Sequence, residues 1–189
     1  MKDKRESSFY ARNRSEWRAW LQKNHDNESK IALLKYKKHT GKPSLSHKES
    51  MEEAICFGWI DTTIKRIDDD TYIRRFARRT DKSKWSDNTL RYAKELIANG
   101  RMTPAGLIRY KEGLSRPTHD YGIPKDPDVP LDLKKALKSQ GVWEKFESVA
   151  PSVRRMHLRW ILRAKQSETR KKRIAAVVSF TEKNKKLGL

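Results

Sequence analysis

Cys56 and Asp61 are the residues of this chain whose types and spacing best suit nucleophilic or acid–base chemistry, and both lie in the segment CFGWID at residues 56–61. A catalytic cysteine needs a thiol pKa lowered by a nearby histidine or by a helix N-terminus. A helix that ends at Gly58 instead places Cys56 near a helix C-terminus, where the dipole raises a thiol pKa. We therefore expect Cys56 to be buried for packing, and an enzyme using Cys56 and Asp61 is the least favoured function class.

Trp59, Asp61 and Trp85 form a candidate ligand pocket. In so hydrophilic a chain, an apolar and aromatic segment that ends in a carboxylate is either the centre of the core or the floor of a site. On the first interpretation Gly58, Trp59 and Trp85 are buried close together. Asp61 then accepts hydrogen bonds from Trp85 or from backbone groups after Gly58. The residues alone leave both interpretations open.

A cluster of basic residues between Tyr72 and Trp85 is a candidate anion-binding site. Arginine side chains suit phosphate groups, and exposed aromatic rings stack on nucleic-acid bases. The alternative is a solvated strand and loop whose rings face the core. The cluster comprises Arg74, Arg75, Arg78, Arg79, Lys82 and Lys84.

The formal net charge of the chain is +20, from 44 Lys and Arg residues against 24 Asp and Glu residues. A charge of this size attracts polyanions such as nucleic acid, an anionic membrane face or an acidic protein. The same charge repels cationic toxins, which disfavours their direct sequestration. General solubility charge explains the composition equally well, because the basic residues are spread along the chain.

Several chemistries have no support in the sequence. The single cysteine excludes an intramolecular disulfide and a multi-cysteine zinc site, and the five histidines lack the spacing of metal ligands. Residues 68–70 are three aspartates without the alternating ligands of a calcium loop, so they suit a turn. The sequence has no Gly-rich phosphate loop and no G-x-S-x-G motif. We predict no catalytic set, no cofactor and no metal site.

The sequence also predicts where the chain works. No apolar run approaches the 18 residues that a membrane span needs, and the first ten residues lack the apolar core of a signal peptide. With no disulfide to form, the chain is expected to be cytoplasmic. Its residues give no indication of an oligomeric state.

The elements that position these residues follow from periodicity and capping signals. Helices are predicted at residues 13–24 and 46–57, from Ser86 to Asn99-Gly100, and from Pro104 to Gly113. Ser46 and Glu49 suit a capping box. Strands are predicted at residues 31–38, 60–67 and 71–76, the last two joined by the turn at residues 68–70.

The second half of the chain has a different character. Residues 114–130 contain four prolines and suit a linker or a strap over the surface. Beyond them every segment has helical periodicity, with a helix at residues 132–138, an apolar face around Phe146, and helices that begin at Pro151 and Ser167. The inward face of the helix from Pro151 is predicted to be Val153, Met156, Trp160, Ile161 and Ala164, and Leu158 and Leu162 on its opposite side predict that it is covered on two faces.

These elements predict an α+β fold, with a small antiparallel sheet and packed helices followed by a C-terminal helical bundle. We expect an α+β domain at residues 1–113 that carries the CFGWID segment. A proline-rich linker or strap at residues 114–130 and a C-terminal helical part at residues 131–189 follow it.

Several short motifs resemble the YdeI/OmpD-associated family, also called the bacteriocin-protection family. They are EEAICFGWID at 52–61, KRID at 65–68, SKWS at 83–86, NGRM at 99–102 and PAGL at 104–107, with further likeness upstream at 36–41 and downstream at ETRKKRI, 168–174. One departure is Arg78-Arg79, where the family usually has Pro-Arg. The resemblance implies a cytoplasmic protein linked by name to tolerance of bacteriocins or envelope stress, with no established catalytic residues.

The leading expectation is a non-catalytic stress-protection protein of the bacteriocin-protection type that binds an anionic partner. Nonspecific binding of nucleic acid is the alternative, and it predicts affinity that falls steeply with salt.

Overall fold

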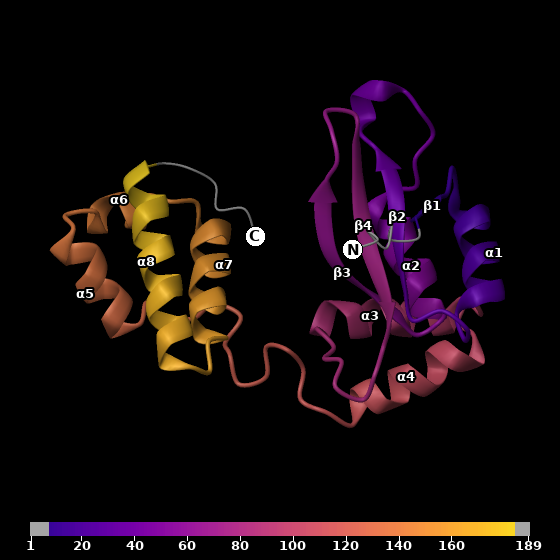
Figure 1. Cartoon of the computed structure of the whole chain (residues 1–189). Helices are drawn as coiled ribbons and strands as arrows, with labels where there is room; N and C mark the ends of the chain where they lie inside the picture. The colour runs from indigo at the N-terminus through magenta and orange to yellow at the C-terminus, as the bar shows by residue number, and fades with distance from the viewer. Residues whose placement is uncertain (1–7, 184–189) are drawn as a thin grey trace, which may run out of the picture. The chain divides into compact units, whose positions relative to one another are not determined.

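The computed structural model describes residues 8–183 and divides the chain into two compact units, Met1–Thr118 and His119–Leu189. The first unit contains a small sheet and helices, and the second is helical (Figure 1). The predicted α+β fold class is therefore confirmed. No helix within residues 8–183 has the length and apolar character needed to cross a membrane.

The sheet has four strands in the order β1-β2-β4-β3: β1 (Ser8–Tyr10), β2 (Lys30–Tyr36), β4 (Thr71–Arg78) and β3 (Trp59–Arg66). The pairs β2–β4 and β3–β4 are antiparallel, as predicted. β1 was not predicted, and it pairs with β2 in parallel, so the sheet is mixed rather than antiparallel. A β-bulge interrupts the β3–β4 pairing between Asp61 and Ile64, and β3 lies at the edge of the sheet.

Local chemistry defines the ends of the elements in this unit, which are α1 (Arg14–Asn24), η1 (Lys38–Thr40), α2 (His47–Cys56), α3 (Asp87–Ala98) and α4 (Pro104–Leu114). The capping box of α2 is present, because Ser46 Oγ accepts from the Glu49 amide and Glu49 accepts from the Ser46 amide. Asp68 closes the β3–β4 turn by accepting from the amides of Asp70 and Thr71 at 2.8 and 2.6 Å.

The core of this unit joins the helices to one face of the sheet. Trp17 of α1, Ile55 of α2 and Phe76 of β4 belong to one buried cluster, and the rings of Trp17 and Phe76 lie 5.3 Å apart. Gly113 does not end α4, contrary to prediction. It lies inside the helix and against Trp85, whose ring atom Cδ1 would be 2.5 Å from an added Cβ. The glycine thus makes room for an indole.

The second unit contains α5 (Leu131–Ser139), α6 (Trp143–Glu147), α7 (Pro151–Leu162) and α8 (Ser167–Lys183). Its core gathers residues from all four helices, including Leu133, Leu137, Phe146, Ile161 and Val177. The segment that precedes α5 is tied to α7 by ion pairs, because Asp120 accepts from Arg159 and Arg163 at 2.7 and 2.5 Å and Asp126 accepts from Arg155 at 2.7 Å.

The predicted inward face of α7 is wrong in part. Met156 is 40% exposed, whereas His157 and Leu158 are buried along with Ile161. The apolar residues of this helix occupy both sides, so periodicity alone gives two possible faces. Packing against α8 selects the side of Leu158 and Ile161, and the His157 ring packs edge-on against Phe180 at 4.6 Å.

Candidate anion-binding site

The two tryptophans of the predicted ligand pocket are core residues. Trp59 is fully buried at the start of β3, and its Nε1 donates to the His25 carbonyl at 3.3 Å. Trp85 is also buried, and both rings belong to the same core cluster. Asp61 is half-buried and accepts from Arg74 Nη1 at 2.7 Å. Of the three residues, Asp61 is thus the most accessible to a ligand, and the pocket itself stays a prediction.

The six predicted anion-binding residues do not form one exposed surface. Arg74 lies on β4, half-buried and paired with Asp61, while Arg75 donates to the Thr63 hydroxyl at 3.1 Å. The exposed Arg78 donates to the Asp26 carbonyl at 2.8 Å, and Arg79 is buried. Lys82 and Lys84 are exposed in the loop before α3. The members best placed to meet a solvent anion are therefore Arg78, Lys82 and Lys84.

Arg79, the residue directly after β4, is buried against Trp85. Its guanidinium lies 3.7 Å from the centroid of the Trp85 ring, and Nη1 donates to the Lys84 carbonyl at 3.2 Å. Burial lowers the pKa of Arg79 to about 10, against the opposing field of Asp61. The cation–π contact fixes Trp85 against β4.

Cys56 lies at the C-terminal end of α2 and is fully buried. Burial raises the pKa of its thiol, as does the nearby Glu53 carboxylate, and Arg18 acts in the opposite direction. A thiolate is the nucleophilic form of cysteine, and a buried thiol with a raised pKa rarely supplies it. This environment disfavours catalysis by Cys56 and fits a packing role.

A group of ion pairs around Glu53 was not predicted from the sequence. The Glu53 carboxylate of α2 is fully buried and faces three arginines. Arg18 donates to it at 2.8 Å, Arg101 also donates to it, and Arg14 lies 3.7 Å away. Glu52 belongs to the same group, at 2.6 Å from Arg14 and 3.3 Å from Arg101. With Glu49, 3.9 Å from Arg14, three carboxylates face the three arginines, and the group joins α1, α2 and the loop before α4 as a structural unit.

A cleft of about 580 Å³ lies at the N-terminal end of α2, and it too was missed. The loop between β2 and α2 lines it with basic side chains, and its lining includes no acidic side chain. Lys42 Nζ lies 4.6 Å from the centroid of the Tyr36 ring. We call it the lysine cleft, and its main lining residues are Tyr36, Lys37, Lys38, Lys42, His47 and Tyr72.

Two basic residues of the sheet, Lys35 and Arg74, do not line the lysine cleft but act electrostatically on His47, which does. Lys35 of β2 is only 1% exposed, and its Nζ has no hydrogen-bond partner within residues 8–183. Burial and the charge of Arg74 lower the pKa of Lys35 to about 8, while Glu49 acts in the opposite direction. Loss of solvation and the charges of Arg74 and Lys35 also lower the pKa of His47, against the field of Asp61. The local field is therefore positive.

Comparison with known families divides the chain in the same region as its structure. Residues 9–109, more than half of the chain, match the family model described as Domain of unknown function (DUF8412). The chain belongs to this family. Residues 126–184 match a second model, Bacteriocin-protection, YdeI or OmpD-Associated. No curated protein and no solved structure matches the chain.

The predicted YdeI/OmpD-associated resemblance is thus confirmed, and the confirming match lies in the C-terminal helical part. The motifs at residues 52–107 that suggested it most strongly lie instead within the DUF8412 match. The likeness to the bacteriocin-protection model is thus limited to residues 126–184, and the model matched by residues 9–109 is one of unknown function.

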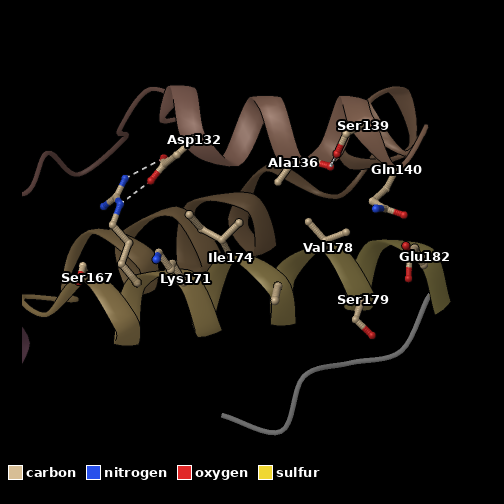
Figure 2. Close-up of a pocket in the computed structure, with 12 residues that line it drawn as sticks. Asp132, Ala136, Ser139, Gln140, Ser167, Lys171, Ile174, Val178, Ser179 and Glu182 are labelled. Atoms are coloured by element: carbon tan, nitrogen blue, oxygen red, sulfur yellow. Dashed lines mark hydrogen bonds and ion pairs between the residues drawn. The ribbon is translucent and has the colours of Figure 1, made fainter.

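The part that matches the bacteriocin-protection model contains an apolar groove of about 770 Å³ between α5 and α8. Figure 2 shows Ile174 and Val178 of α8 pointing toward α5, opposite Ala136. At one end Asp132 accepts from Arg170 at 2.6 and 2.9 Å, and Glu182 lines the other end. This lining suits an apolar side chain better than an anion.

Proposed function

We propose that the chain is a cytoplasmic, non-catalytic protein of the bacteriocin-protection type that binds an anionic partner through the lysine cleft. The observation that carries this proposal is the lining of the cleft, where lysines and His47 meet with no acidic side chain among them. In most of the other basic groups described above, such as the arginines around Glu53, carboxylates neutralise the cations. In the cleft, Lys37 donates to the Asp68 carbonyl at 3.3 Å and acts electrostatically on its carboxylate, whereas Lys38 and Lys42 form no ion pair within residues 8–183. Cations gathered around a concave surface attract an anion.

Binding is favoured over catalysis by the state of the reactive groups. Cys56 is buried with a raised pKa, and Asp61 is paired with Arg74. Direct capture of a cationic toxin is disfavoured because the chain itself has a net charge of +20. A protective role for the chain therefore fits an anionic partner better than it fits the toxin itself.

Nucleic acid is the second candidate partner. Tyr36 and Tyr72 lie among the cations of the lysine cleft, and tyrosine rings can stack on unpaired bases while lysines contact phosphates. Lys82 and Lys84 supply further exposed charge in the same unit. The two candidates predict different relative affinities. A nucleic-acid site should bind DNA more tightly than a polyanion that has carboxylates and no bases, whereas a general anion site should bind both.

Fluorescence anisotropy with a labelled DNA duplex, a labelled single strand and labelled polyglutamate tests the proposal at several salt concentrations. The logarithm of the DNA affinity falls linearly with the logarithm of the salt concentration. Replacement of Lys37, Lys38 and Lys42 by alanine should make this slope on duplex DNA less steep by roughly 3, at about 0.9 per lost phosphate contact. The matched control replaces the exposed Lys23, Lys94 and Lys111, which changes the net charge equally and should leave the slope nearly unchanged.

Equal weakening by the two triple variants would refute the cleft as the site, since it would show that net charge alone drives binding. Absence of binding to all three polymers at low salt would refute the anionic partner. Strong preference for the single strand would favour the nucleic-acid candidate.

A further inference from the structure

We propose that a single phosphate-like oxyanion binds between Lys35, Arg74 and the first turn of α2, on the inner side of His47, which lines the lysine cleft. This inference rests on the proposed function only in that the anion enters through the same cleft. It adds a ligand class, a small oxyanion with several acceptor oxygens, that a general polyanion surface does not require.

The first observation is that the ammonium of Lys35 is buried without a bonded partner within residues 8–183, so that the Glu49 carboxylate compensates its charge only through the field. Its side chain is 1% exposed and its ammonium has no hydrogen-bond partner within the described chain. A buried ammonium ordinarily pairs with a carboxylate or loses its proton, because an isolated buried charge is costly. With a pKa of about 8, Lys35 is still mainly protonated at neutral pH. An anion from solution would complete its environment.

The second observation is the position of Arg74 beside Lys35. In the β2–β4 register Leu33 pairs with Arg74 and Lys35 pairs with Tyr72, so Lys35 and Arg74 are diagonal neighbours on one face of the sheet. Diagonal positions in an antiparallel pair lie roughly 7–8 Å apart, within joint reach of two long side chains. Arg74 Nη1 donates to Asp61, while its buried Nε has no described partner. Each residue therefore has a donor to offer.

The third observation is the N-terminal end of α2, which lies in the same electrostatic field. His47 is the first residue of α2, and it lies in the electrostatic field of Lys35, Arg74 and Asp61. The N-terminal end of a helix attracts anions through its free N–H groups and its dipole. The acidic groups nearby are already engaged, because Glu49 caps Ser46 and lies 3.9 Å from Arg14, and Asp61 pairs with Arg74.

A multivalent oxyanion fits these donors better than a halide does. The ammonium of Lys35, the Nε of Arg74 and the helix end approach from separate elements, so one ligand must offer several oxygens at once. A phosphate group does so, and its negative charge is attracted by the net positive charge that remains when Arg74 is paired with Asp61. It can arrive as the free ion or as the terminal phosphate of a larger molecule.

The test uses Lys35→Met in the full chain, with inorganic phosphate as the probe and sodium chloride of equal ionic strength as the reference. In wild type, phosphate at a hundredfold excess over its Kd should raise the Tm by roughly 5 °C or more. The variant should show no such rise. Its Tm in chloride should exceed that of wild type, because a buried charge that lacks a bonded partner in the described chain has been removed. The matched control is Lys30→Met, an exposed lysine on the same strand, which should keep the phosphate response.

A wild-type Tm that phosphate does not change would overturn the inference, as would a Lys35→Met variant that keeps the full response. If the variant does not fold, acetylation of Lys35 in wild type decides the matter. Phosphate should slow that acetylation at least threefold relative to chloride, and an unchanged rate would refute the site. Oligonucleotides with and without a 5′-phosphate separate the two sources, because only a terminal phosphate should compete with the free ion.

The failure of this site is distinguishable from the failure of the proposed function. The triple variant at Lys37, Lys38 and Lys42 should lose salt-dependent binding of polymers and keep the response to phosphate. Lys35→Met should do the reverse. A polymer affinity that falls equally in both variants would refute a separate small-anion site and leave the polyanion proposal standing.

Discussion

Replacement of Glu53 by glutamine is the sharpest test of how the α+β unit is held together. The substitution keeps the size of the side chain, removes its charge and turns one acceptor oxygen into a donor. Glu53 is fully buried, with Arg18 donating at 2.8 Å and Arg101 also donating. In the variant, an amide N–H must face a guanidinium, and Arg18 and Arg101 lose the charge that neutralises them.

The expected cost is about 3–5 kcal/mol of unfolding free energy, the usual result of removing one partner from a buried ion pair. That is a large fraction of the roughly 5–15 kcal/mol that stabilises a typical domain. Arg14 and Glu52 remain paired at 2.6 Å, which holds the loss near the lower end of the range. Urea unfolding followed by tryptophan fluorescence measures it, since Trp17 and Trp59 are buried in the same core.

The control is Glu95→Gln on α3, an exposed residue 3.3 Å from Arg91. Exposed pairs of this kind contribute about 0.3–0.5 kcal/mol, so its midpoint should hardly move. The three arginine side chains are 30–35% exposed, so a loss below about 1 kcal/mol for Glu53→Gln would show that water compensates them for the lost charge, which would refute the ion-pair group as a structural unit.

Four further outcomes follow from the structure. Trp59→Ala should lower the unfolding free energy by about 3–5 kcal/mol in urea titration, and a loss near zero would favour a surface site instead. Gly113→Ala should lower the Tm although alanine favours helix, because its Cβ would meet Trp85 at 2.5 Å, and a gain in Tm would contradict that contact. The folded-state pKa of Lys35, about 8, lies below its ordinary 10.5, so the folded state binds fewer protons between these values. Stability of wild type relative to Lys35→Met should then rise by up to about 3 kcal/mol from pH 8 to pH 10.5, and a flat difference in urea midpoints would argue against a buried charge. Cys56→Ala should leave bacteriocin tolerance intact in a cell-survival assay, and complete loss in a folded variant would revive the enzyme hypothesis.

The parts of the fold that short-range chemistry determines are predictable from the sequence. The capping box of Ser46 and Glu49 lies within four residues, and so does the turn closed by Asp68. The strand β1 has three residues, too few for a periodicity to appear, and it depends on a partner more than twenty residues away. The inward face of α7 depends on α8, so Met156, predicted to face inward, is exposed, and His157, for which no position was predicted, is buried.

The candidate site, too, is predictable from the sequence only in part. Strand alternation places Lys35 on the core-facing side with Ile31 and Leu33, a signal in the sequence that predicts a buried lysine. The fate of Arg74 and Arg79 has no such signal. Arg74 pairs with Asp61 and Arg79 is buried against the Trp85 ring, contacts that a linear cluster of basic residues does not reveal. A run of cations is therefore a weak guide to which of them meet solvent.

The exposed edge strand β3 links partner binding to self-association. Ile64 of β3 and Ile67, directly after it, are 57% and 52% exposed. Among the described strands β3 has a neighbour on one side only, and such a free edge can pair with the same strand of another copy. The bulge after Asp61 and the charges of Lys65 and Arg66 oppose such pairing, and the high net charge keeps copies apart. A polyanion that neutralises this charge also removes the repulsion between molecules. Saturation with an anionic partner should therefore bring the chain closer to aggregation, so that the charge which attracts the partner is also what keeps the free protein dispersed.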